Sequence, residues 1–431
     1  MLKTLKNAWG IEELRKKILF TLFIILVYRL GNAVPVPYVN TAMLESYFNT
    51  VNNTILGLWN TMSGGSFSMA TIFALSIQPY INASIIIQLL TIAIPALERL
   101  QKEGGEEGRK KIASITRYTT VGIGLIMGFA YYMLIKNGVN GQSMLTSDGV
   151  GIWPAIVIIM TFMAGSALIM WMGEQVTEFG VGNGISIILF ASIIARFPSS
   201  IGTMITNVSN GSLAWWALAL VIIGALAIIV LIVIVNDAER RIPVQYSKRV
   251  VGRKLYGGQS THLPMKVNMS GVMPIIFAQS IASIPATFAA FWGKTDGWVN
   301  TWFGTNSIPY AIIYFLLIIF FAYFYSTIQF NPIEVANNLK KNGGYIPGFR
   351  PGKPTSEFIH KVLNKITLFG AIYLGIIAVV PILVAHFSQS AALTGISLGG
   401  TSIIIVVGVA LETVRALEAQ MLMRNYKGFL D

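Results

Sequence analysis

The sequence has no cysteine, only three histidines and few charged residues. Without cysteine the chain can form neither a disulfide bond nor a thiolate-bound metal site. The histidines, at 262, 360 and 386, do not have the spacing of metal ligands. Charged residues make up 11% of the chain, against about a quarter in soluble globular proteins. This low charge excludes an ordinary soluble domain.

Two motifs of nucleotide-dependent and metal-dependent enzymes are also missing. The chain contains no G-x-x-x-x-G-K-[ST] phosphate-binding loop and no H-E-x-x-H zinc motif. The segment GVGNGIS (180–186) has alternating glycines, but it lacks the spacing of a dinucleotide-binding loop. The chain is therefore expected not to be an enzyme and to need no cofactor.

What the chain does have is hydrophobic sequence, which accounts for 54% of its residues. A membrane-spanning helix needs roughly 20 apolar residues, and ten segments approach that length. The first follows a basic start without a small-residue cleavage site, so we interpret it as a retained span. The ten predicted spans cover residues 18–36, 72–96, 118–136, 152–172, 184–206, 214–235, 269–293, 309–330, 366–386 and 401–423.

The positive charges are distributed unevenly between the predicted loops. If the N-terminus is cytoplasmic, all but four of the 31 lysines and arginines fall on the cytoplasmic side. The exceptions are Arg29, Lys136, Arg196 and Lys294. Because cytoplasmic loops carry the excess of Lys and Arg, both termini are predicted to lie inside.

Two cytoplasmic loops are longer than the others, at about 236–268 and 331–365. Both mix basic residues with Tyr, Pro and Gly, which favours stiff turns over a disordered basic tail. RRIPVQYSKR in the first loop alternates well enough to predict a short strand. Composition alone leaves two roles open, which are docking of a large anionic partner and contact with anionic lipid.

A third segment, residues 55–70, is moderately apolar but too short to cross a membrane. Ser-Gly-Gly separates it from the following span. It is either an external interfacial helix or a re-entrant plug inside the membrane. Because irregular backbone at membrane depth must be buried in protein or line an aqueous cavity, the plug interpretation requires a cavity.

Ionisable residues are scarce in the predicted spans. Glu174 and Glu178 lie at the inner end of the fourth span, and Glu412 lies in the inner half of the tenth. Ion-coupled transporters normally carry such groups well inside their spans, so this pattern weakens a transporter hypothesis without excluding carriers of neutral solutes.

The second span instead carries uncharged polar residues. On a helical wheel Ile77, Ile81, Ser84 and Gln88 fall within about 60° of one another, so one narrow stripe changes from aliphatic to polar along its length. An ordinary helix–helix seam explains such a stripe. A cavity wall with a dry aliphatic constriction is the alternative.

Six sequence blocks together resemble the SecY/Sec61 alpha family of protein-conducting channels. One departure is YVN (38–40), where the family often has glycine and an acidic residue, and it lies in a predicted external loop. The six blocks are YRLGNAVPVP (28–37), GGSFSMATIFALSIQPYINASIIIQLL (64–90), GEQVTEFGVGNGISIILF (173–190), the run from ERRIPVQYSKR to THLPMKVNMSGVMPIIFAQS (239–280), NPIEVANNLKKNGGYIPGFRPGKPT (331–355) and GGTSIIIVVGV (399–409).

The resemblance implies an all-α membrane protein whose ten transmembrane helices form two five-helix, pseudo-symmetric halves, 1–210 and 211–431, around a central pore. It implies a plug at about 55–70 and a lateral gate formed by spans 2 and 3 against 7 and 8. Ser84, Gln88 and Gln279 are the expected polar seam of that gate. Leu189 stands where the family often has isoleucine. The ring that closes the pore is expected to contain Ile77, Ile81, Ile185, Leu189, Ile276 and Ile405.

The resemblance also implies partners for the long basic loops. They are expected to dock the SecA motor ATPase or the ribosome, with Arg253 and Lys254 as ribosome contacts and Arg350 as the position for motor-driven translocation. Cations that reach toward rRNA phosphates or an acidic surface give a salt-dependent attraction. The further partners implied are SecE, SecG, signal peptides, translocating polypeptides and membrane lipids, in a bacterial plasma (inner) membrane. A solute transporter and a scaffold without a pore are the rival classes.

Overall fold

The structure is a computed structural model of the 431-residue chain. It describes residues 2–50, 55–102, 104–138, 143–149, 151–211, 214–246, 249–251, 254–256, 260–269, 271–291, 302–304, 307–388 and 391–425. In order along the chain the α-helices are α1 (Leu2–Gly10), α2 (Glu12–Gly31), α3 (Thr41–Thr50), α4 (Ile55–Met62), α5 (Gln78–Ala93), α6 (Pro95–Lys102), α7 (Gly105–Asn137), α8 (Ile152–Phe179), α9 (Gly184–Ile194), α10 (Phe197–Ser209), α11 (Trp215–Asp237), α12 (Met273–Phe291), α14 (Ile308–Gln329), α15 (Pro332–Lys341), α16 (Lys353–Ser388) and α17 (Ala391–Asn425).

Each predicted span overlaps a helix, and the fifth, 184–206, covers two, α9 and α10. By length and composition, six helical segments of the described residues are able to cross a membrane, and α5 with α6, bent by 105°, makes a seventh. Of the six, three lie before residue 210, namely Gly105–Asn137, Ile152–Phe179 and Gly184–Ser209. The other three are Leu218–Asp237, Ile308–Lys341 and Lys353–Val384. The remaining predicted spans fall on α2, α12 and α17. The chain is therefore a mostly helical, multi-pass membrane protein.

The second span begins later than the hydrophobic run that predicted it. Residues 72–77 form turns, and helix α5 starts at Gln78. Pro79 stands in its first turn, where the missing N–H breaks no helical hydrogen bond. Ile77 precedes the helix as its N-cap, so the wheel applies to Ile81, Ser84 and Gln88 and not to Ile77.

The two long basic loops fold together, which the all-helical prediction did not include. β1 (Glu239–Tyr246) confirms the predicted strand and pairs antiparallel with β4 (Ser260–Lys266). β5 (Gly344–Tyr345), from the second loop, pairs with the far edge of β1. β2 (Arg249–Val251) and β3 (Lys254–Tyr256), which follow β1 and precede β4 in the sequence, form a separate two-stranded hairpin. The fold thus contains β-structure outside the predicted spans, because the alternating residues of these loops give strands a buried face.

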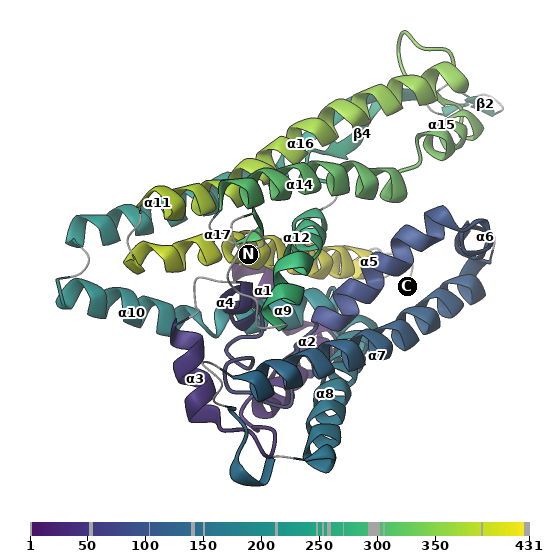
Figure 1. The fold of residues 1–431 in the computed structure, drawn as a ribbon. Helices are drawn as coiled ribbons and strands as arrows, with labels where there is room; N and C mark the ends of the chain where they lie inside the picture. Colours follow the sequence, from purple (N-terminus) through teal and green to yellow (C-terminus); the bar gives the residue numbers. More distant parts are fainter. Residues whose placement is uncertain are drawn as a thin grey trace.

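A small core holds the sheet of β4, β1 and β5 against the following helices. It contains six buried residues from both loops and from α16: Ile242, Val244, Met265, Ile346, Ile359 and Leu363. Helices α15 and α16 lie beside the strands, and α6 lies toward the same end of the molecule, while α3 and α10 lie toward the other (Figure 1). The basic loops therefore form one packed unit at one end of the helix bundle.

The main core lies between the helices of the bundle. Helix α12 contacts α4, α5 and α7, and α17 contacts α4 and α9. Residues on both sides of position 210 therefore enclose one apolar interior, and α4 lies inside it.

Candidate functional site

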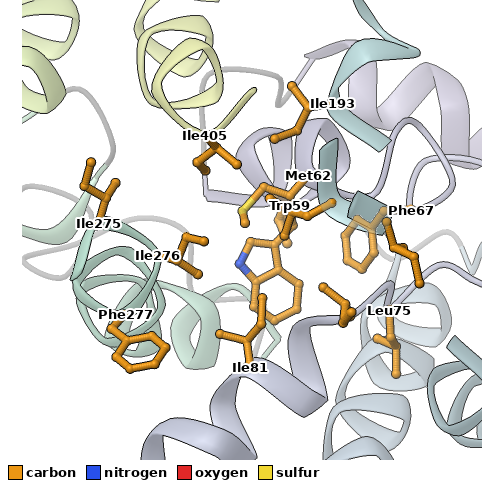
Figure 2. Packing of buried hydrophobic residues seen from close by; sticks show 14 of the residues in the cluster. Trp59, Met62, Phe67, Leu75, Ile81, Ile193, Ile275, Ile276, Phe277 and Ile405 are labelled. Atoms are coloured by element: carbon orange, nitrogen blue, oxygen red, sulfur yellow. The ribbon is translucent and has the colours of Figure 1, made fainter. Parts of the chain in front are cut away.

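Short helix α4 occupies the centre of the bundle. Its residues Trp59 and Met62 are 7% and 4% exposed. Figure 2 shows Ile81 of α5, Ile276 of α12 and Ile405 of α17 around them. Of the two alternatives for residues 55–70, the structure therefore has a segment folded back into the bundle interior and not a helix on the surface.

The aliphatic residues predicted to form a ring are nearly all buried in the main core. Ile185 is the exception, since it is half-buried. Its side chain packs against Gly173 of α8, so closely that a Cβ added to this glycine would lie 3.1 Å from the Ile185 Cγ1. The five buried residues are Ile77, Ile81, Leu189, Ile276 and Ile405, each at most 5% exposed.

Ile193 of α9 is a residue that the sequence argument missed. It is 1% exposed and belongs to the same buried cluster as Met62; both are labelled in Figure 2. Residues four apart lie on one face of a helix, and Ile193 follows Leu189 by four. This four-residue spacing could have identified Ile193 from the sequence, whereas the family resemblance did not include this residue.

The chain leaves α4 through two glycines. Gly64 and Gly65 have φ of 70° and 93°, a left-handed conformation that glycine adopts without steric cost. A Cβ on Gly64 would lie 2.8 Å from the backbone oxygen of Ser192, whereas a Cβ on Gly65 would meet nothing within 4 Å. The junction therefore requires glycine at position 64 for both conformation and space.

The segment after these glycines is firmly held. The Tyr131 hydroxyl of α7 donates a hydrogen bond to the backbone oxygen of Phe67, and the two rings stack at 4.3 Å. The Ile72 amide donates to the oxygen of Val34 at 3.0 Å, and the Val36 amide donates to that of Ala70 at 2.9 Å. Residues 66–77 are thus an anchor, and Gly64–Gly65 is the joint between this anchor and α4.

Polar contacts tie α4 to the helices on either side. The Gln78 Nε2 of α5 donates to the Met62 Sδ at 3.2 Å, and the Gln279 Nε2 of α12 donates to the same sulfur at 3.7 Å. The Gln88 Nε2 donates to the Ser84 Oγ at 3.3 Å within α5. The three residues predicted for one polar seam therefore fall into two separate contacts, and Gln279 belongs to the one around α4.

Two amide oxygens of these glutamines have no hydrogen-bond partner among the described residues. Within the described residues, the Oε1 atoms of Gln88 and Gln279 are buried and have no hydrogen-bond donor. A buried acceptor without a donor is unfavourable, and buried polar groups are normally paired. Both glutamines therefore use their amide N–H groups in the contacts described above and leave the amide oxygen unpaired.

The acidic residues noted in the spans lie away from this centre. Arg117 of α7 pairs with Glu174 of α8 at 2.9 Å. Glu412 lines a cavity of about 360 Å³ together with Lys266, Asn268 and Arg415. Among the described residues no group of three or more His, Asp or Glu side chains could hold a metal ion. The centre of the bundle is accordingly a packed apolar core with a few neutral amides.

Of the predicted docking residues, two can be located. Arg350 is exposed, and its backbone oxygen accepts a hydrogen bond from the Thr355 hydroxyl at 2.7 Å. Lys254 begins β3, opposite Val251 in the hairpin. Arg253 lies outside the described residues. The arginine and the hairpin extend from the two loops that share the sheet of β4, β1 and β5.

Comparison with known proteins places this arrangement in a family. The family model SecY matches residues 71–414. Among the relatives, the protein translocase subunit SecY of Streptomyces coelicolor is 45% identical over 444 residues, and that of Mycobacterium bovis is 43% identical over 446, each alignment covering 100% of both chains. The chain belongs to the SecY family. It is the protein-conducting channel subunit of the Sec translocase and is not itself catalytic.

Solved structures support the fold of this SecY family member. A structure described as a protein-conducting channel superposes with a TM-score of 0.67 at 17% identity, covering 94% of this chain and 92% of the other. Sec61 in a canine ribosome–channel complex superposes with a TM-score of 0.62 at 15% identity, with the same coverage. The fold resemblance thus extends over nearly the whole chain.

Proposed function

We propose that the structure is the closed state of a channel in which α4 is the plug and the buried aliphatic residues around it are the pore ring. The observation that carries the proposal is the position of α4, which contacts α9, α12 and α17 and accepts a hydrogen bond from Gln78 of α5. Ile77, Ile81, Ile185, Leu189, Ile276 and Ile405 form the proposed ring, and we add Ile193 to it. A hydrophobic constriction resists wetting, and aliphatic side chains seal around any polypeptide without binding it specifically.

In this proposal ten helices cross the membrane as two five-helix halves, 1–210 and 211–431, with both termini in the cytoplasm of a bacterial cell. Unfolded secretory polypeptides pass through the ring, and membrane-protein helices leave sideways between α5 and α12. Amide contacts between membrane helices average roughly 0.6 kcal/mol, which suits a seam that opens and closes. The incomplete bonding of Gln88 and Gln279 favours the same role.

The energy for transport is proposed to come from partners at the basic end of the molecule. Arg350 and the β2–β3 hairpin, with Arg253 and Lys254, are the proposed contacts for SecA and the ribosome. The support is their place in two loops that share one sheet. SecE and SecG are proposed as small membrane companions.

Reconstitution of the purified complex tests this proposal. The complex, with whatever small membrane subunits co-purify, is placed in a planar bilayer and its ion conductance is recorded. Deletion of residues 55–62 should convert a closed channel into a conducting one. A deletion complex that still inserts but conducts nothing would support a scaffold without a pore and contradict the proposal.

A further inference from the structure

The sulfur of Met62 accepts hydrogen bonds from two opposing sides. Gln78, at the start of α5, and Gln279, in α12, both point an amide N–H at it, with N–S distances of 3.2 Å and 3.7 Å. All three side chains are at most 6% exposed. Met62 is also the last residue of α4, separated from the glycine joint only by Ser63. One atom therefore connects α4 to the helices on both sides of the proposed lateral gate.

We propose that Met62 is a positioning residue that couples the separation of α5 and α12 to the release of α4. This inference rests on the proposed roles of α4 as plug and of α5 and α12 as gate helices. As long as the two helices stay together, both glutamines hold the sulfur and α4 remains in the pore. When the helices separate, the sulfur loses at least one donor, which weakens the hold on α4. The contact of Asn60 with the Ser68 amide, at 3.0 Å, is independent of the two gate helices.

The distances make this coupling sensitive. Hydrogen bonds weaken steeply as they lengthen and bend, and the thioether is a weak acceptor. The Gln279 contact, at 3.7 Å, is already the longer of the two, so it breaks first as α12 moves away. A neutral hydrogen bond of this kind shifts a two-state equilibrium by roughly two- to tenfold. The contact is thus strong enough to bias the closed state and weak enough for an entering polypeptide to overcome.

Simple packing is the competing explanation, because Met62 also fills apolar space beside Trp59 and Ile276 (Figure 2). Two substitutions separate the explanations. Met62→Leu keeps an apolar side chain of similar size but removes the acceptor, whereas Met62→Gln restores an acceptor and makes the side chain polar. If Met62 acts only by packing, Met62→Gln should open the channel more than Met62→Leu does. If the hydrogen-bond acceptor matters, Met62→Leu should open it more.

The chain offers a matched control in Met127 of α7. The Asn82 Nδ2 of α5 approaches the Met127 Sδ at 3.9 Å, and Met127 is 7% exposed. This is the same type of contact, but both residues lie before residue 210, so it does not bridge α5 and α12. Met127→Leu reports the effect of losing a buried amide–thioether contact as such.

The experiment measures the fraction of time that reconstituted channel complexes conduct without substrate, with the 55–62 deletion as the fully open reference. We expect Met62→Leu to raise this fraction roughly two- to tenfold, Met62→Gln to return it toward wild type and Met127→Leu to leave it unchanged. Adding Gln279→Leu to Met62→Leu should have less effect than Gln279→Leu alone, because the shared contact is already lost.

Two results would overturn the inference. One is a Met62→Gln channel that conducts more than Met62→Leu, and the other is a Met62→Leu channel that behaves like Met127→Leu. If the 55–62 deletion conducts, either result contradicts only the coupling role of Met62 and leaves the proposed plug role of α4 intact. A deletion that does not conduct contradicts the proposed function itself, so the two failures are distinguishable.

Discussion

The Tyr345 hydroxyl donates a hydrogen bond of 2.9 Å to the Oε1 of Gln245, a residue one hundred positions earlier in the chain. The two residues are partners in the register of β5 and β1. This contact ties the loop after α14 to the loop after α11. Because both loops carry proposed docking residues, a partner that binds one of them acts on a unit built from both.

We expect Arg350→Glu to abolish motor-driven export while the protein still folds and inserts. The side chain is exposed, and the contact that holds its loop uses the backbone oxygen, so reversing the charge removes an attraction without breaking the fold. Export of a signal-bearing substrate into membrane vesicles with SecA and ATP measures the effect. Lys361→Glu, an equal charge change at an exposed position of α16, is the control and should retain most export; normal export by Arg350→Glu contradicts its docking role.

Ile359→Ala should specifically loosen the packed unit that the two basic loops form. Ile359 is 0% exposed in the core between α16 and the sheet of β4, β1 and β5, and such truncations cost about 2–5 kcal/mol. Hydrogen exchange of the β1 and β5 amides should accelerate, and motor-driven export should fall, while resting ion conductance stays low. Ile333→Ala, at a position 64% exposed, should change none of these. Unaltered exchange in Ile359→Ala would show that the sheet does not depend on this core.

Ile81→Asn should raise resting ion leak and relax the demand for a signal sequence. Ile81 is 5% exposed beside α4, and loss of about half the stabilisation from a buried aliphatic side chain increases the open fraction about tenfold. Conductance in a planar bilayer and export of a substrate with a defective signal sequence measure the two effects. Ile81→Leu, which keeps the site apolar, should stay closed. The ring assignment is wrong if Ile81→Asn leaves both quantities unchanged.

Gly64→Ala should disturb the joint of α4 more than Gly65→Ala does. Both residues have positive φ, so both substitutions incur backbone strain of about 1–2 kcal/mol. Only the Cβ at position 64 approaches another group, the backbone oxygen of Ser192. Gly64→Ala should therefore show the lower Tm and the higher resting conductance of the pair. Equal behaviour of the two variants would mean that the contact with α9 does not hold the joint.

Hydropathy predicted the bundle well because a membrane-crossing helix needs a long apolar run whatever its neighbours are. Every predicted span overlaps helical structure, although the fifth is divided between α9 and α10, and the alternation in RRIPVQYSKR predicted β1. The start of α5 was less accurate, since residues 72–77 are as apolar as the helix that follows them. Pro79 marks the true first turn, and the sequence showed the proline but not the turns before it.

The contents of the centre were harder to predict because they depend on contacts between distant segments. Residues 55–70 are apolar enough for a surface or an interior, and only the packing of α4 among helices on both sides of residue 210 decides between the two. Gln279 was expected beside Ser84 and Gln88, yet its amide turns to Met62, 217 residues away. Periodicity specifies which face of a helix a residue occupies and not which neighbour that face meets.

The glycine joint has a consequence for how the channel closes again. A displaced α4 would stay covalently attached to the segment held by Tyr131, Val34 and Val36, so its return is an intramolecular step. Short flexible tethers give effective concentrations in the millimolar range. If α4 is the plug, as proposed, its return to the pore after each substrate has a rate that is independent of how much protein the membrane contains.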